Sequence, residues 1–553
     1  MIPQRGTGVG RRAPRRPVAI IGSGFAGTIL ARLLASRNVP VVVIERGRHP
    51  RFALGESSTP LAAICLERLA ADYGLPDLAA LAGYGRWSRE LPHLRRGLKR
   101  GFTFYAHRHG RRYENGETNS ARLLVAASPV DELADAHWLR SDVDHHLVER
   151  ARAEGVEVVE DCEITDLRRT PSGWRVGGER PRGRLSLEAS FVVDGSGAGA
   201  FLPRRLGLPD RRYGARAGSA GLPDTGLVFA HFEGVASFVE SAGGGAGFRE
   251  GPYPDERAAV HHLLEEGWMY VLPFDDGRVS AGVVLDRAHP RAREWLGLDP
   301  SLAWSRCLEA YPTLGVQFGD SRPMRAPALA PRIGHWFERA GGEEWALLPS
   351  TFFFASPLFS TGIAWSLIAV ERLARGLALA DPRARTAAVS EYAELLATEA
   401  AAIAELTGPA YRLRHRFDAF CGWSHVYFAA ASFHESWQRL ADAPSPEGWA
   451  PIGFLGASDP VIRRIIPRAA ERLARAVDGR DPGDLEPSLA PLLSGRNVAG
   501  LADARRRRLY PVELDSLVDH HASFGLTRAE AVERVPRLRS PAPLAPGTAP
   551  AAV

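Results

Sequence analysis

The sequence predicts an α/β fold in which a parallel sheet with crossover helices is interleaved with an antiparallel sheet and followed by a helical region. Two all-apolar stretches near the start, Val18–Ile21 and Val41–Ile44, flank a segment with apolar residues at helical spacing. This pattern is typical of a βαβ unit that is buried on both faces. Residues 226–290 alternate as half-exposed antiparallel strands do. From about residue 382 the apolar spacing is largely helical.

The overall composition is that of a globular protein with more than one domain. The chain has 553 residues, of which 45% are hydrophobic and 24% charged, so we expect two or three domains. Its 69 basic and 64 acidic side chains nearly cancel. The arginine clusters at 11–16 and 505–508 have no aromatic residues between them for stacking on bases, so nucleic acid is not an expected partner.

The four cysteines are far apart and show no Cys/His spacing of a metal site or a disulfide framework. No apolar run has the length of a membrane span. We therefore expect a cytoplasmic protein without a metal or a membrane anchor.

Changes of pattern along the chain predict the following domain limits. We expect disordered tails at both ends, a basic one at 1–16 and a second at 540–553. Between them we expect a cofactor domain made of 17–215 and 331–381, with an inserted segment at about 91–137. An antiparallel-sheet substrate domain is expected at 216–330 and a helical region at 382–539.

A glycine fingerprint follows the first predicted strand and opens the first predicted helix. Gly22, Gly24 and Gly27 have G-x-G-x-x-G spacing, and Glu45 ends the second strand. Such glycines allow a tight turn and a close approach to a pyrophosphate at a helix N-terminus, and a carboxylate at the next strand end binds ribose hydroxyls. We therefore predict that these four residues and Arg46 bind a dinucleotide.

Lys99 is the only lysine in the chain, whereas every other residue among the 69 basic side chains is arginine. Guanidinium is always protonated and is a poor nucleophile, whereas an amine is compact and its pKa changes readily on burial. A position that keeps lysine in such a chain indicates a need for the size or the reactivity of an amine. The alternative is chance.

A second glycine segment lies far downstream of the first. Asp194, Gly195 and Gly197 follow a predicted strand, and Arg140 begins an Arg-x-x-x-Asp pattern that ends at Asp144. This arrangement resembles FAD-dependent proteins of the aromatic-hydroxylase type, whose Rossmann-like cofactor domain is assembled from distant pieces. The resemblance implies that these residues lie at the cofactor. A surface helix with scattered charges is the alternative for 140–144.

Four further segments resemble motifs of flavin-dependent halogenases and occur in that family's order. They are Gly55-Glu56-Ser57-Ser58-Thr59-Pro60, Lys99-Arg-Gly101-Phe-Thr-Phe104, Gly267-Trp268-Met-Tyr270-Val-Leu-Pro273, and Pro357-Leu-Phe-Ser360-Thr361-Gly362. The resemblance implies that Glu56 and Ser57 line the flavin, Lys99 is catalytic, Trp268, Tyr270 and Pro273 screen the substrate from the flavin, and Ser360, Thr361 and Gly362 hold halide. For the two aromatics, placement on a core strand is the alternative.

The same resemblance implies a reaction. FADH2 and O2 oxidise chloride or bromide to hypohalous acid, and Lys99 passes the halogen to an electron-rich aromatic substrate, either free or tethered to a carrier protein. Phe359 in the halide loop resembles the phenol and pyrrole branch more than the tryptophan branch. Because the chain has no second dinucleotide fingerprint, we expect a separate flavin reductase to supply FADH2.

The segment before the halide loop departs from the family's GDAAGFxDP pattern. Pro349 replaces the glycine, Ser350 the first aspartate, which binds the ribityl chain, and Ser356 the second. Serine offers only an uncharged hydrogen bond there, and proline removes a backbone donor. We interpret this as a divergent FAD site, not an inactive one, because the lysine and halide segments remain.

Two other functions are compatible with the same sequence. A flavin-dependent aromatic monooxygenase shares the fold and most of the glycine motifs, and it would form product without halide. A non-catalytic protein that binds a partner or a small molecule is favoured by the altered 349–356 segment, and it would be colourless when purified. Aromatic residues crowd 411–437, where we expect mainly core packing, with an aromatic pocket as the alternative.

Overall fold

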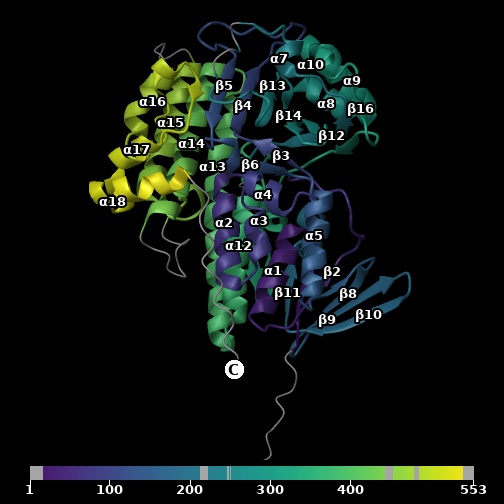
Figure 1. Ribbon diagram of the computed structural model, residues 1–553. Coiled ribbons are helices and arrows are strands. Elements are labelled where there is room, and N and C mark those ends of the chain that lie inside the picture. Colours follow the sequence, from purple (N-terminus) through teal and green to yellow (C-terminus); the bar gives the residue numbers. More distant parts are fainter. Residues whose placement is uncertain are drawn as a thin grey trace, which may run out of the picture.

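The computed structural model describes residues 16–211, 222–245, 248, 251–441, 452–478 and 485–539. The predicted tails, apart from Arg16, lie outside these residues, and so does the predicted boundary at 215–216. Figure 1 shows two bodies of sheet, one above the other, with a group of helices beside the upper one.

The lower body is a six-stranded sheet in the order β19-β20-β11-β1-β2-β7. Its strands are β1 (Val18–Ile21), β2 (Val41–Ile44), β7 (Glu157–Val159), β11 (Phe191–Asp194), β19 (Gly341–Gly342) and β20 (Trp345–Leu347). All except β19 run parallel to their neighbours. Segments from three distant parts of the chain therefore meet in one sheet, as the aromatic-hydroxylase resemblance implies.

Helices cover this sheet because its central strands are apolar on both faces. Every residue of β1, β2 and β11 is buried, which requires cover above and below. Helix α1 (Phe25–Ser36) packs against both α5 (Arg140–Ala153) and α12 (Gly362–Ala378). The predicted βαβ unit is thus confirmed.

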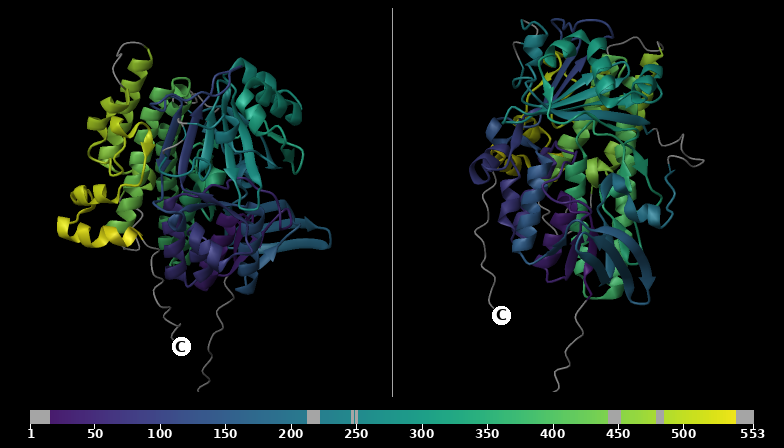
Figure 2. Two further views of the ribbon diagram at one scale, coloured as in Figure 1. Left: turned by 45° about the horizontal axis from the view of Figure 1, so that its top comes forward. Right: turned by 90° about the vertical axis from the view of Figure 1, so that its right-hand side faces the viewer.

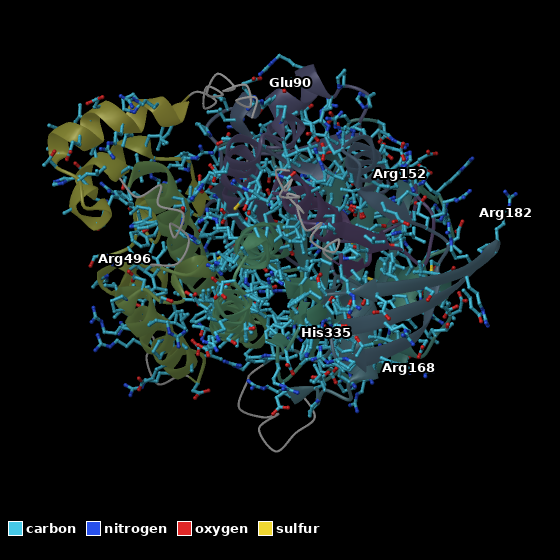
Figure 3. The ribbon with its side chains drawn as sticks, turned by 90° about the horizontal axis from the view of Figure 1, so that it is seen from below. Glu90, Arg152, Arg168, Arg182, His335 and Arg496 are labelled. Carbon is cyan, nitrogen blue, oxygen red and sulfur yellow. The ribbon has the colours of Figure 1, made fainter. Side chains whose placement is uncertain are left out.

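A small antiparallel sheet projects from the lower body. It contains β8 (Glu163–Thr170), β9 (Gly173–Arg180) and β10 (Gly183–Ala189). Figure 3 shows Arg168 and Arg182 on this sheet, with Arg182 at its far end. Trp174 anchors its base, since the indole Nε1 donates a 2.9 Å hydrogen bond to Glu344 O.

The upper body is a nine-stranded, mainly antiparallel sheet, in the order β16-β12-β15-β14-β13-β4-β5-β22 with β17 paired to β12. Its strands are β4 (Gly101–Ala106), β5 (Arg122–Ala126), β12 (Thr225–Glu233), β13 (Ala259–Leu263), β14 (Gly267–Pro273), β15 (Val279–Asp286), β16 (Arg322–Pro323), β17 (Ala328–Ala330) and β22 (Leu509–Tyr510). The antiparallel sheet expected from 226–290 is confirmed. The inserted segment at 91–137 also contributes to it, through β4 and β5.

Helices lie on both faces of the upper sheet. On one face are α8 (Pro290–Leu296), α9 (Pro300–Ala310) and α10 (Pro312–Gln317) (Figure 1). On the other, Phe428 and Phe420 of α14 (Phe417–Leu440) pack against Phe102 and Phe104 of β4. The sheet is therefore a buried wall, one side of which faces α14.

The C-terminal region is helical, as the sequence predicts, and it lies beside the upper sheet in the left view of Figure 2. Its main helices are α13 (Pro382–Leu413), α14 (Phe417–Leu440), α15 (Pro460–Val477), α16 (Leu485–Leu493), α17 (Leu514–Asp519) and α18 (Arg528–Arg534). Within the described ranges, none of the helices combines the length and the apolar character needed to span a membrane.

Candidate functional site

The glycine fingerprint lies where the backbone leaves no room for side chains. Gly22 has φ +97°, and a Cβ there would lie 2.7 Å from Gly195 O. A Cβ on Gly27 would lie 2.3 Å from Gly22 O. Only glycine fits these positions, because the end of β1, the start of α1 and the end of β11 touch one another. The two predicted glycine segments are thus brought together.

The start of α1 suits a pyrophosphate. Gly24 is the N-cap, no described side chain caps the helix, and its first turn carries no acidic residue, so the backbone N–H groups remain available to an anion. The Arg140 guanidinium lies 3.5 Å from the Cβ position of Gly24. This arrangement of glycines, N–H donors and positive charge fits the dinucleotide part of FAD.

Glu45 lies at the end of β2, beside the fingerprint, but its carboxylate already has partners. Oε2 accepts hydrogen bonds from the backbone N and Oγ of Ser23, each at 2.9 Å, and from Arg51 at 3.1 Å. Burial opposes the charge, while Arg51 and the backbone donors stabilise it, so that the pKa of Glu45 is lowered. Arg46, the next residue, is exposed. Contacts of these two residues with the ribose remain predictions.

Arg140 is not on an exposed helix face. Its guanidinium donates to both carboxylate oxygens of Asp144, at 2.9 and 2.8 Å, and to Leu54 O at 2.7 Å. Both side chains of the ion pair are buried. The Arg-x-x-x-Asp pattern therefore fixes a cation between the fingerprint and the segment that contains Gly55, Glu56 and Ser57.

Residues 54–58 form a strip that runs from Arg140 to Lys99. The strip follows β6 (Asp135–Trp138): Trp138 N donates to Glu56 O at 2.6 Å, and Ser58 N donates to Ala136 O at 3.2 Å. The Glu56 carboxylate is buried, with Oε1 2.9 Å from His231 Nε2. Both predicted residues of this motif, Glu56 and Ser57, are thus held in an extended segment beside β6.

Lys99 ends β3 (Arg96–Lys99), which pairs with β6 so that Lys99 lies opposite Asp135. Its side chain is fully buried. Nζ donates a 2.5 Å hydrogen bond to Ser58 O and lies 4.1 Å from the centre of the Phe102 ring. Burial lowers the pKa of Lys99 to about 8, against the opposing effect of the Asp135 charge. At pH 7 most of the amine is therefore still protonated, and the neutral form becomes the major one only above about pH 8.

The predicted halide loop meets the other end of the strip. Ser360, at φ +55°, donates a 3.0 Å hydrogen bond from Oγ to Ser57 Oγ. Thr361 is the N-cap of α12, and no side chain in the described structure caps that helix. The first N–H groups of α12, beginning at Gly362, therefore remain free for an anion. Ser57 and Ser58 thus link this loop to Lys99.

The second glycine segment contacts the altered segment at 349–356. Gly197 N donates to Thr351 Oγ1 at 2.9 Å, and Ser350 Oγ lies 3.9 Å from the Cβ position of Gly197. Ser350 is exposed there. The Asp194 carboxylate accepts from Ser196 N and Leu202 N, so it shapes the turn that presents Gly195 and Gly197. Cofactor contacts of Ser350 and Asp194 stay predictions.

Trp268 connects the upper sheet to the segment before the halide loop. Its indole Nε1 donates to Tyr411 Oη at 2.8 Å, and Tyr411 Oη lies 2.7 Å from Ser356 Oγ. Trp268 and Tyr270 are both buried on β14. At the end of that strand, Pro273 O lies 1.9 Å from the Cβ position of Gly97 in β3. The motif thus supports both the Lys99 strand and the halide loop.

We expect the Trp268–Tyr411–Ser356 chain to be energetically coupled. Tyr411→Phe should lower the free energy of unfolding by about 1–3 kcal/mol, because it leaves the buried Trp268 indole N–H without a partner and removes one of the two hydrogen bonds of Ser356 Oγ, and Trp268→Phe by about 1 kcal/mol. In chemical unfolding, the double variant should lose less than the sum of the single losses. Additive losses would contradict a shared network. Trp174→Phe, which removes a similar indole hydrogen bond far from the loop, is the matched control.

A cavity of about 200 Å³ opens beside these residues. Thr59 and Thr361 lie in its wall, as do Phe102 of β4 and Asp135 of β6. Helix α14 contributes Tyr427, Phe428, Ala431, Ser432, Glu435, Ser436 and Arg439. The rest of the wall comes from residues within 60–67, 82–86, 125–133, 454–455, 498–501 and 510–517 and from Leu538. Lys99 Nζ therefore lies between the strip that reaches the halide loop and two side chains that line the cavity.

Three residues of this site have no sequence signal of their own. Asp135 is found only through its register with Lys99, and Tyr411 and Glu435 only through the packing of α13 and α14. The crowding of aromatics at 411–437 was a partial signal, since Tyr427 and Phe428 line the cavity. Four further rings of this stretch are buried as core, as the sequence predicts: Trp423, His425, Phe433 and His434.

Residues 17–375 match the sequence model of the family described as FAD dependent oxidoreductase. The chain belongs to this family. FAD is therefore its cofactor, as the glycine motifs predict. The residues at the start of α1, with Gly22, Gly24 and Arg140 around them, fit the dinucleotide part of FAD.

Curated relatives confirm the predicted resemblance to flavin-dependent halogenases. The chain is 28% identical to tetracycline 7-halogenase of Kitasatospora aureofaciens over 357 residues, which cover 63% of this chain and 60% of the relative. It is 28% identical to monodechloroaminopyrrolnitrin halogenase PrnC of Pseudomonas fluorescens over 372 residues, 65% of this chain and 61% of the relative. The matched region thus spans about three fifths of the length of each.

Among solved structures, halogenase PltM in complex with phloroglucinol and FAD is similar, with a TM-score of 0.78 at 22% identity. The superposition covers 89% of this chain and 99% of PltM. At this identity the likeness concerns the fold, and it confirms the predicted fold class.

Proposed function

We propose that this protein is an FADH2-dependent halogenase that transfers halogen by way of Lys99 to an electron-rich aromatic ring, such as a phenol or a pyrrole. The observation that carries the proposal is the position of the only lysine. Its amine is buried between Ser58, on the strip that meets the halide loop, and Phe102 and Asp135, which line the cavity.

The cofactor and the halide would occupy the two ends of the strip. Gly22, Gly24 and the first turn of α1, with Arg140 beside them, would hold the dinucleotide. Reduced and supplied with O2, FAD would provide the oxidising equivalents that convert halide to hypohalous acid. The N–H groups of Thr361 and Gly362 would hold chloride or bromide, because uncapped helix starts favour anions.

Lys99 would then carry the halogen away from the place where it is made. The neutral amine attacks the halogen of hypohalous acid, so that an N–X bond forms, the O–X bond breaks, and the oxygen leaves as water with the amine proton. The aromatic carbon next attacks the halogen. A C–X bond forms, the N–X bond breaks, and the proton lost by the ring restores the amine. Arginine, which stays protonated, lacks the lone pair for this step.

The names of the relatives favour an electron-rich substrate. They include tetracycline 7-halogenase and a Pseudomonas fluorescens enzyme described as 1H-pyrrole-2-carbonyl-[peptidyl-carrier protein] chlorinase, 23% identical to this chain. We accordingly propose an aromatic substrate, either free or carrier-tethered, with FADH2 supplied by a separate reductase. The four cysteines are buried and unpaired, which suits the cytoplasmic location we propose.

We expect purified protein, with a flavin reductase, NADH, FAD and bromide or chloride, to halogenate members of a phenol and pyrrole panel, as detected by mass spectrometry. Omitting halide should abolish product. An oxygenated product formed without halide, carrying label from 18O2, would instead establish a monooxygenase. Protein that neither turns yellow nor binds FAD on titration would establish a binding protein.

A further inference from the structure

The cavity wall is more apolar than polar, and of the five acidic side chains that line it, two interact electrostatically with each other. Phe102, Tyr427 and Phe428 provide aromatic surface, while Asp135 of β6 and Glu435 of α14 face the same space. The two acids come from opposite walls, since β6 extends from the strip and α14 covers the sheet. A carboxyl pair in such a place needs either internal partners or a ligand.

Asp135 is the more deeply placed of the two. Its side chain is 2% exposed, and Oδ2 has no hydrogen-bond partner within the described parts of the chain. Lys99, directly opposite in the strand pair, directs its Nζ to Ser58 O. The Asp135 carboxyl group thus lines the cavity while one of its oxygens, Oδ2, is buried without a partner, and a buried polar group without a partner is costly.

Glu435 of α14 is the second acid of the pair. Burial, reinforced by the charge of Asp135 and opposed by that of Arg439, raises the pKa of Glu435 to about 8. Arg439 also lines the cavity but is shared with Glu67, at 3.3 Å. Burial likewise raises the pKa of Asp135, which Lys99 partly offsets. Near neutral pH, the pair can therefore both accept and donate hydrogen bonds.

We propose that Asp135 and Glu435 recognise the substrate through a hydrogen-bond donor on its ring, a phenolic O–H or an aromatic N–H, and discriminate against aromatic carboxylates. This inference rests on the proposed function, because it assigns the substrate class of that same site. A donor would pair with an acceptor oxygen of the two acids, whereas a carboxylate would lose its hydration beside the negative charge that the pair retains in a low-dielectric cavity.

The same contact positions the ring for halogen transfer. Phe102 lies under Lys99 Nζ and lines the cavity, so a ring hydrogen-bonded to Asp135 lies on the side of the cavity closest to the amine. A phenol that donates its O–H to a carboxylate gains electron density at its ortho and para carbons. Asp135 is accordingly a residue that both selects and positions the substrate.

The test is binding measured on the full-length protein without flavin or halide, by calorimetric titration with phenol, anisole and benzoate. Phenol should bind about tenfold or more tightly than anisole, which lacks the donor, and benzoate should bind more weakly than either. In Asp135→Asn and Glu435→Gln, the preference for phenol over anisole should fall, and benzoate binding should improve. Glu132→Gln, at an exposed carboxylate of the same cavity, should leave these ratios unchanged.

The outcomes separate this inference from the proposed function. Equal affinities for phenol and anisole, or ratios that both variants leave unchanged while circular dichroism reports native folding, would overturn it, whatever the activity. Donor-dependent binding without halogenation in the reductase assay would support the recognition site and count against the halogenase. Retained FAD binding in both variants would show that the effect is on the organic ligand.

Discussion

Lys99→Ala should lower the halogenation rate by about 100-fold or more, with FAD binding retained. Positioned groups that take part in proton or group transfer commonly contribute about 10²–10⁴ to a rate, and the Lys99 amine lies between the strip and the cavity wall with a lowered pKa that favours its neutral, nucleophilic form. The measurement is initial rate with excess reductase, alongside FAD titration and thermal unfolding.

Lys99→Arg separates chemistry from charge. It keeps a cation opposite Asp135 but cannot form the N–X bond, so its halogenation rate should fall nearly as far as that of Lys99→Ala. Wild-type activity should rise as the pH passes through about 8, where the amine loses its proton. Full activity in Lys99→Arg would show that a hydrogen-bonding cation is sufficient. A pH profile unaffected by the change to arginine would show that the amine does not titrate during the reaction.

The βαβ unit could be predicted because its signals are local. Val18–Ile21, the glycine fingerprint and Val41–Ile44 lie within one short stretch, and strand burial and tight turns are encoded there by residue type. The approach of Gly195 to Gly22 is different, since the two are far apart in sequence, and only the family resemblance implied it. The order of the family motifs thus predicted that these two glycine segments meet, which the spacing of apolar residues could not.

The cavity could not be predicted in the same way. Lys99 is conspicuous because the chain is otherwise free of lysine, whereas Asp135 is one of many acidic residues, and its importance comes from strand register. Glu435 reaches the cavity only because α14 packs on β4 through Phe428. The positions of Asp135 and Glu435 depend on how β6 and α14 pack in the folded protein, and the sequences of these two elements carry no special motif. The sequence therefore indicates the chemistry of the Lys99 amine but not the residues around it.

Gly22→Ala should abolish measurable FAD binding and, with it, activity. At φ +97° an alanine is strained by about 1–3 kcal/mol, and its Cβ would lie 2.7 Å from Gly195 O, so the ends of β1 and β11 must separate. This displaces the turn that presents α1 to the pyrophosphate.

Gly183→Ala is the matched control, because Gly183 has the same φ of +97° with nothing within 4 Å of its Cβ position. The two variants should lose similar stability from backbone strain, with the further loss in Gly22→Ala due to the clash, but only Gly22→Ala should fail to bind FAD in a fluorescence titration. Normal FAD affinity in Gly22→Ala would place the cofactor away from this turn.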